Sequence, residues 1–256
     1  MFLVFNKQKI VTYFVSVLAV LVLFFVAGNI KEEKVVETVS GSEKLLPIYN
    51  VKTEEKKVAF TMNCAWNADD IDSILETLEK EDVKITFFMV GEWIDKYQES
   101  VEKIYKAGHE IANHSDTHKH VNNLSYEDNV KEIESANEKI KKITGVENKL
   151  YRAPYGEYNN TVIKAAKENG YIPIQWSLDT IDYTGITGEE MWNRIEAKIK
   201  EGDIILSHNG TKHTADSLEM LIKNIKEKGF EIVKVSDLIY QDNYKIDING
   251  TQIKDK

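Results

Sequence analysis

From residue 57 onward, short runs of β-branched and aromatic residues alternate with longer amphipathic segments, most of which end in glycine. This alternation predicts repeated strand–helix units and therefore a parallel α/β fold. We expect strands at residues 58–61, 85–90, 110–112, 149–151, 172–176, 203–206 and 231–233. Helices are expected at residues 71–80, 93–106, 126–143, 162–169, 189–200 and 216–228. Seven such strands favour a distorted (β/α)7-type barrel over an open sheet, which spacing alone does not exclude.

The first 29 residues differ from all that follow. Lys7 and Lys9 precede an almost purely apolar run, residues 10–28, which is long enough to span a bilayer. A secretory signal peptide is the alternative, but its apolar part is usually about 7 to 15 residues long and ends in a small-residue cleavage site. We therefore expect residues 1–29 to be a cytoplasmic stub and transmembrane anchor, or an uncleaved signal. The domain would then be extracellular at the cell membrane, or secreted if the segment is cleaved.

The remaining chain divides by composition. Residues 30–56 are charged without apolar periodicity and are expected to be a linker, residues 57–240 a single domain, and residues 241–256 a polar C-terminal tail. The 33 basic and 42 acidic residues give a net charge of −9, spread along the chain without a basic stripe. Nucleic acid is therefore not expected as a partner, and we expect a monomer.

Unusual polar residues follow the ends of the expected strands. In a parallel α/β architecture the loops after the strands open on one face, so residues distant in sequence converge there. The residues concerned are Asn63, Asp69 and Asp70 after the first strand, His114 and His118 after the third, Arg152 after the fourth, Asp179 and Asp182 after the fifth, and His208 after the sixth.

His114 and His118 are four residues apart, which is close enough to share a metal ion. By itself this spacing is weak, but the pair follows a strand and acidic residues converge from another loop. An oxygen ligand from Asp70 or Asp69 would leave a coordination position open for water, as a catalytic metal requires. The sequence therefore predicts a metal site at the mouth of the barrel.

The other loops allow more than one interpretation. Arg152 begins a segment that Pro154 and Gly156 shape into a turn, with or without a function. Asp179 and Asp182 are three residues apart and either cap a helix or orient a histidine. His208 ends an apolar strand that would deliver a titratable ring to the mouth.

Four short motifs, taken in order, resemble those of the polysaccharide deacetylases, carbohydrate esterase family 4, also called the NodB-homology domain. They are His114-Ser-Asp-Thr-His118, Arg152-Ala-Pro-Tyr-Gly156, Asp179-Thr-Ile-Asp-Tyr183 and Leu206-Ser-His208. The resemblance covers about residues 57 to 240 and implies a distorted barrel with a metal at its mouth. In general appearance the chain is most similar to membrane-anchored or secreted peptidoglycan deacetylases of spore-forming bacteria.

The resemblance implies a role for each matching residue. His114 and His118, with an aspartate, would bind a divalent ion, zinc or a similar metal such as cobalt, which polarises the acetamide carbonyl and activates water. His208, oriented by Asp182, would protonate the leaving amine. The substrate-binding residues implied are Tyr155, whose backbone would help to hold the oxyanion, Leu206, which would line the pocket for the acetyl methyl, and Trp176.

The first motif departs from the family pattern Thr-Phe-Asp-Asp-Gly, because Asn63 stands where the general base is expected. Matching Trp66 to a longer form of this motif makes Asp70 the expected metal ligand, with Asp69 as the alternative. Arg152, which pairs with the base in typical members, would face a neutral partner. Asp69 could substitute as base, metal-bound hydroxide could form unaided, or turnover could be lost.

Two functions follow from the resemblance. The first is a metal-dependent hydrolase that removes acetyl groups from N-acetyl hexosamines of peptidoglycan or a related cell-wall polysaccharide. The second is a metal-retaining pseudoenzyme that binds wall glycan, with catalysis impaired because Asn63 replaces the base.

Overall fold

The computed structural model of this protein describes residues 44–255. The expected anchor at residues 1–29 therefore lies outside the described residues. Within residues 44–255, no helix combines the length and the apolar character needed to cross a membrane.

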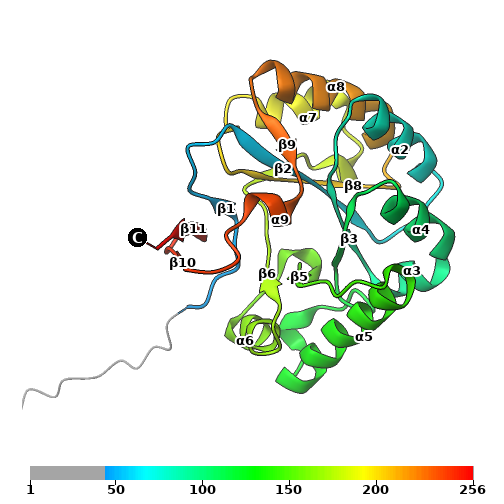
Figure 1. Ribbon diagram of the computed structural model, residues 1–256. Coiled ribbons are helices and arrows are strands. Elements are labelled where there is room, and N and C mark those ends of the chain that lie inside the picture. The colour runs from blue at the N-terminus through cyan, green and yellow to red at the C-terminus, as the bar shows by residue number, and fades with distance from the viewer. Residues whose placement is uncertain (1–43, 256) are drawn as a thin grey trace, which may run out of the picture. The chain divides into compact units, whose positions relative to one another are not determined.

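The centre of the described domain is an eight-stranded sheet in which every strand pairing is parallel. It is curved into an α/β half-barrel (Figure 1). The strand order is β6 (Ile172–Pro173), β5 (Leu150–Tyr151), β4 (Glu110–Asn113), β3 (Thr86–Met89), β2 (Lys57–Cys64), β8 (Ile204–His208) and β7 (Leu178–Asp179), with β9 (Glu231–Val233) also paired to β2. Each predicted strand is present, and β7 is the addition. The parallel α/β class is confirmed, but the sheet is not closed because β6 and β7 are its end strands.

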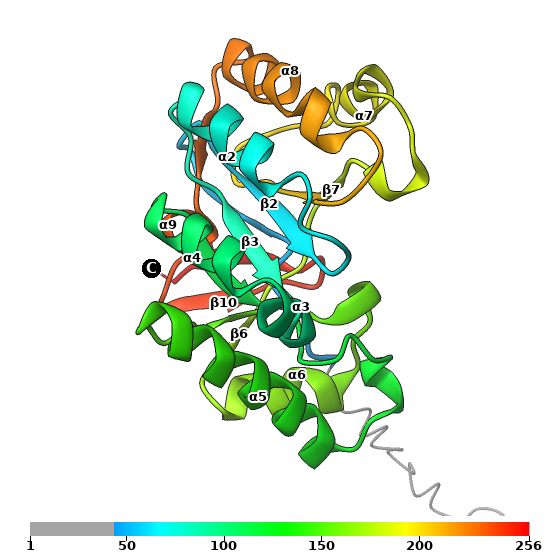
Figure 2. The same cartoon turned by 90° about the vertical axis from the view of Figure 1, so that its right-hand side faces the viewer.

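Helices cover the outer side of this sheet, as Figures 1 and 2 show. They are α2 (Ile71–Lys80), α3 (Gly91–Lys96), α4 (Gln98–Lys106), α5 (Tyr126–Thr144), α6 (Asn160–Glu168), α7 (Gly188–Ile195) and α8 (Thr214–Glu227). The short helix α9 (Val235–Leu238) packs on the inner side instead, where its buried residues join Ala59 and Ile204. The helix predicted at residues 93–106 is divided at Tyr97, whose φ of −125° and ψ of 45° leave the helical region. Ser125 accepts the backbone N–H of Asp128 at the start of α5, as its capping spacing predicts.

The central strand β2 shows why the site lies where it does. Successive side chains of a strand point to opposite faces. Phe60, Met62 and Cys64 therefore pack into the cluster beneath the helices. Thr61 and Asn63 point into the barrel interior, where both are buried and hydrogen-bonded to Arg152. A polar residue is thus placed in the interior at the carboxyl end of β2.

Two segments expected to lie outside the domain are part of it. β1 (Asn50–Val51) pairs with β11 (Thr251–Lys254), which also pairs with β10 (Tyr244–Ile246), so residues from the expected linker and tail share a sheet. Ile48 is fully buried and donates its backbone N–H to the carbonyl of Pro173 in β6. Strands of two to four residues carry too little periodicity to be recognised in the sequence.

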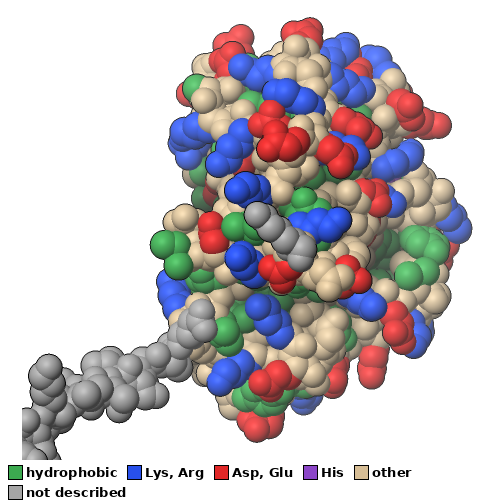
Figure 3. All heavy atoms as spheres, turned by 60° about the vertical axis from the view of Figure 1, so that its left-hand side comes forward, with side chains coloured by type: hydrophobic (Ala, Val, Ile, Leu, Met, Phe, Trp, Pro, Cys, Tyr) green, Lys and Arg blue, Asp and Glu red, His purple; other side chains and the backbone are tan. Residues whose placement is uncertain are grey.

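Basic and acidic side chains alternate over the face of the protein that Figure 3 shows.

Candidate functional site

A cavity of about 430 Å³ opens at the carboxyl ends of the parallel strands. The strand register brings its walls together, because Asn63 on β2 pairs with His208 on β8, and Asp179 on β7 pairs with Leu206. Residues that line the cavity and were predicted to act in the site are Asn63, His114, His118, Tyr155, Trp176, Leu206 and His208. Ala65, Trp66, Gly156, Asp179 and Tyr183 complete the lining.

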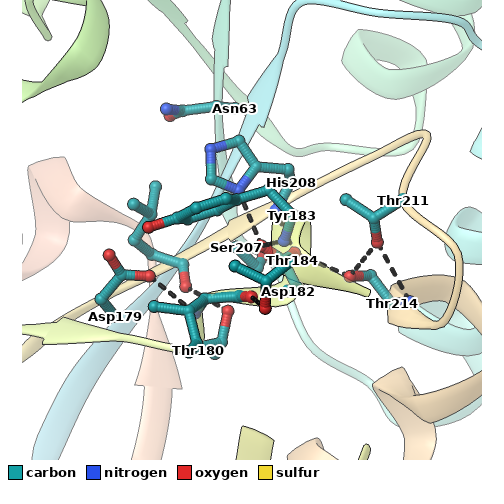
Figure 4. Close-up of polar contacts among 12 residues, drawn as sticks. Asn63, Asp179, Thr180, Asp182, Tyr183, Thr184, Ser207, His208, Thr211 and Thr214 are labelled. Atoms are coloured by element: carbon teal, nitrogen blue, oxygen red, sulfur yellow. Dashed lines mark hydrogen bonds and ion pairs between the residues drawn. The ribbon is translucent and has the colours of Figure 1, made fainter. Parts of the chain in front are cut away.

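Asp182 holds His208 from behind the cavity wall, as Figure 4 shows. The carboxylate is fully buried and accepts hydrogen bonds from Nδ1 of His208 at 2.8 Å and from Thr214 Oγ1 at 2.7 Å. It also accepts the backbone N–H groups of His208 and Tyr183. Because a carboxylate only accepts hydrogen bonds, the proton of His208 lies on Nδ1, and Nε2 faces the cavity.

Asp179 has a different role from Asp182. Its Oδ1 accepts the N–H of Ile181 at 2.7 Å and so supports a sharp turn, in which the β-branched Ile181 has a φ of 48°. Burial raises the pKa of Asp179. The helix-cap interpretation does not apply, since Asp179 lies in β7 and its side chain lines the cavity. Strain of this kind is retained where the surrounding structure requires one geometry.

His114 is buried and bonded through both ring nitrogens. Nδ1 lies 2.8 Å from the carbonyl oxygen of Arg152, and Nε2 lies 3.2 Å from Nδ2 of Asn63. Burial lowers the pKa of His114 well below its ordinary value, so the ring is neutral. Burial also lowers the pKa of His118, whose ring centroid is 5.0 Å from that of His114.

Arg152 lies beneath Asn63, fully buried. Its Nη1 donates to Oδ1 of Asn63 and Oγ1 of Thr61, both at 2.9 Å, and its Nη2 donates to the carbonyl of Gln175 at 3.0 Å. Its guanidinium also lies 3.8 Å from the ring centroid of Phe88. All three of these hydrogen-bond acceptors are neutral, and burial lowers the pKa of Arg152 to about 9. Arg152 therefore faces an amide where the resemblance implies a carboxylate.

The structure does not bring Asp69 or Asp70 to the histidine pair. Asp70 stands at the N-cap position of α2, and its carboxylate accepts from Asn209 Nδ2 at 3.1 Å and Gly210 N at 2.7 Å. Asp69 is exposed, and neither residue lines the cavity. Within residues 44–255, no three His, Cys, Asp or Glu side chains are grouped so that they could hold a metal ion. The arrangement thus does not fit the three-ligand divalent site that the resemblance implies.

Glu132 on α5 fixes the loop that carries the histidine pair, and it is not among the site residues predicted from the sequence. Its carboxylate accepts from Ser115 Oγ at 2.9 Å, from Thr117 N at 2.9 Å and from Thr117 Oγ1 at 2.7 Å. Asp116 N and Lys119 Nζ add longer contacts of 3.2 Å. The sequence does carry a signal for Glu132, because this glutamate lies on the buried stripe of an amphipathic helix. Charged residues are rarely buried there without partners.

Three large aromatic side chains stand exposed on the rim of the cavity. Trp66, Tyr155 and Tyr183 are 49%, 57% and 51% exposed. The rings of Trp66 and Tyr183 flank His208 at centroid distances of 5.3 and 5.4 Å, and His120 stacks on Tyr155 at 4.3 Å. Exposed aromatics gathered around one cavity indicate a binding surface.

A parallel α/β half-barrel with its polar residues on loops at the carboxyl ends of the strands belongs to the class whose enzymes act at that face. A family model described as polysaccharide deacetylase matches residues 50–174. A peptidoglycan-N-acetylglucosamine deacetylase of Bacillus cereus is 31% identical over 75% of this chain and 92% of its own length. This chain belongs to the polysaccharide deacetylase family.

Two further proteins are similar to this chain. The uncharacterized protein YlxY of Bacillus subtilis is 36% identical over 75% of this chain, and the match spans 60% of its length. A crystal structure of a pseudoenzyme of carbohydrate esterase family 4 from Bacillus anthracis is 32% identical, with a TM-score of 0.72 over 75% of this chain and 68% of that one. A mutant of that pseudoenzyme has restored enzymatic activity. The family thus includes both named deacetylases and a protein described as a pseudoenzyme.

Proposed function

We propose that this protein binds N-acetylated amino-sugar units of peptidoglycan or a related wall glycan in the cavity, with deacetylation impaired. The observation that carries the proposal is Asn63, whose amide stands between Arg152 and His114 where the family pattern has a basic carboxylate. An amide does not take a proton from water at neutral pH. Losing such a base typically costs a factor of about 10² to 10⁴ in rate.

Recognition is supported by the parts of the site that remain. The cavity is large enough for a sugar ring, and the rim presents Trp66, Tyr155 and Tyr183 as apolar faces for it. Leu206 and Trp176 line the cavity and provide an apolar surface for an acetyl methyl group. Strained backbone at Tyr155 and Ile181, with φ of 58° and 48°, supports a pocket held in one shape.

A slow N-deacetylase is the second candidate. It is favoured by the contact of His208 with Asp182 at 2.8 Å, which turns Nε2, the atom through which a general acid delivers its proton, toward the cavity. A pocket used only for binding has no requirement for this pair. In this candidate His208 protonates the leaving amine, and the products are acetate and a free amino sugar.

We also propose that the domain acts outside the cell membrane, held there by the apolar run at residues 10–28. The proposal is supported by the chemistry of the expected ligand, because peptidoglycan lies outside that membrane. Protease added to intact cells should remove the domain and spare a tag placed at the N-terminus. Protection of the domain would contradict this location.

The decisive experiment titrates the full chain with chito-oligosaccharide and peptidoglycan fragments by calorimetry, and assays acetate release in parallel. We expect binding that persists in a chelator, weakens with de-N-acetylated glycan, and is accompanied by no measurable acetate. Equal affinity for the acetylated and the de-N-acetylated glycan would overturn the binding proposal, and so would the absence of binding to either. Acetate release that disappears in His208→Ala would establish the second candidate instead.

A further inference from the structure

We infer that the amide of Asn63 occupies the electron pair of His114 that a metal ion would use, so that this pocket excludes a divalent cation by an internal hydrogen bond. The inference concerns metal affinity and goes beyond the proposed glycan binding.

The directions of the hydrogen bonds follow from the atoms alone. A carbonyl oxygen only accepts, so Nδ1 of His114 carries the proton donated to Arg152 O at 2.8 Å. Nε2 therefore carries a lone pair. A guanidinium only donates, so the atom of Asn63 that lies 2.9 Å from Arg152 Nη1 is the oxygen. The other amide atom is the nitrogen, and it donates to Nε2 at 3.2 Å.

These three bonds form a closed circuit. Arg152 donates to Asn63, Asn63 donates to His114, and His114 donates back to the backbone of Arg152. Rotating the Asn63 amide by 180° would set its N–H₂ against the guanidinium and its oxygen against the lone pair of Nε2. Both contacts would become repulsive, so the circuit permits only the orientation in which the Asn63 oxygen faces Arg152.

The charges and ligands around the pocket also disfavour a divalent cation. A divalent site in a protein needs anionic or lone-pair ligands that are free to point at the ion. Here the lone pair of His114 is used, Asp70 is engaged by Asn209 and Gly210, and the buried guanidinium of Arg152 lies directly behind Asn63. A dication would have to break a buried hydrogen bond and approach a buried positive charge.

The test measures zinc affinity by competition with a chromophoric chelator. The parent chain should bind no stoichiometric zinc. Asn63→Asp should raise the zinc affinity by about 10- to 100-fold over that of the parent. Adding His118→Ala to Asn63→Asp should remove the gain, whereas adding Asp70→Asn should leave it unchanged. Stoichiometric zinc in the parent that is lost in Asp70→Asn would overturn the inference.

A second readout needs no substitution. Ring ¹⁵N NMR of the parent should show His114 as the neutral Nδ1–H tautomer, and its signals should not move when zinc is added. Movement of both ring signals on zinc addition would contradict the circuit. Glycan binding is measured separately on the same samples. A failure of glycan binding would not change the zinc result, and a failure of the zinc prediction would not change the glycan result.

Discussion

Both carboxylate oxygens of Asp182 hold His208. Oδ1 lies 2.8 Å from ring Nδ1, and Oδ2 accepts the backbone N–H of the same residue at 2.6 Å. Ring and backbone are thus fixed by one buried group, with Thr214 as an additional donor to Oδ2. The side-chain hydrogen bond that orients the ring of His208 comes from this carboxylate, and the rings of Trp66 and Tyr183 flank it.

We expect Asp182→Ala to destabilise the fold by about 3 kcal/mol, because it leaves several buried donors without an acceptor. Urea unfolding followed by circular dichroism measures the change. The exposed Asp242→Ala is the control and should shift the free energy of unfolding by less than about 0.5 kcal/mol. Equal effects of the two substitutions would show that Asp182 does not anchor the site.

Glu132→Gln should loosen the loop from Ser115 to Lys119 and weaken glycan binding. Burial alone would raise the pKa of Glu132, but hydrogen bonds from Thr117 and Ser115 outweigh it and lower the pKa. A carboxyl with a lowered pKa stabilises the fold above its ordinary pKa and loses that contribution as pH falls through the lower value. The stability difference between parent and variant should therefore be complete at pH 7 and shrink as the pH falls below about 4.

The exposed Glu134→Gln on the same helix provides the comparison for Glu132→Gln. It should change neither glycan affinity nor stability at any pH. A pH-independent difference between Glu132→Gln and the parent would indicate that the carboxylate charge is not what holds the loop.

Trp66→Ala and Tyr183→Ala should each weaken glycan binding by roughly 3- to 10-fold, the loss expected for one aromatic contact. Both side chains are about half exposed, so stability should change little. Tyr105→Ala serves as the matched control, because Tyr105 is also an exposed aromatic (39%) but does not line this cavity. Calorimetric titration separates the outcomes, and a Tyr105→Ala effect as large as that of Trp66→Ala would argue against the rim.

Gln252→Ala should destabilise the domain by about 1 to 3 kcal/mol. The buried amide donates to the carbonyl of Tyr240 at 2.6 Å and accepts the N–H of the same residue at 2.9 Å, so truncation leaves two backbone groups unpaired. The exposed Lys245→Ala in the neighbouring strand should have no comparable effect. A melting temperature unchanged by Gln252→Ala would mean that the C-terminal strands do not support the domain.

Much of the fold follows from local pattern. The strands β2, β3 and β4 are rich in β-branched or apolar residues and are bounded by helices with clear signals, such as the glycine at position 145 with a φ of 73° after α5. The parallel order then places residues after strand ends at one mouth. From this rule alone the sequence predicted that His114, His118 and His208 lie close together, and all three line the cavity.

The sequence by itself determined the parallel α/β class, the strand-end location of the site, and the amide at position 63. Only the tertiary structure decided that Asp70 bonds to residues about 140 positions away instead of facing the histidines, and that Glu132 holds their loop. It also decided that Asn63, Arg152 and His114 close a circuit at the carboxyl ends of three strands, β2, β5 and β4. The physical reason is that hydrogen-bond partners distant in the chain are selected by packing, whereas periodicity reports only which face of an element is buried.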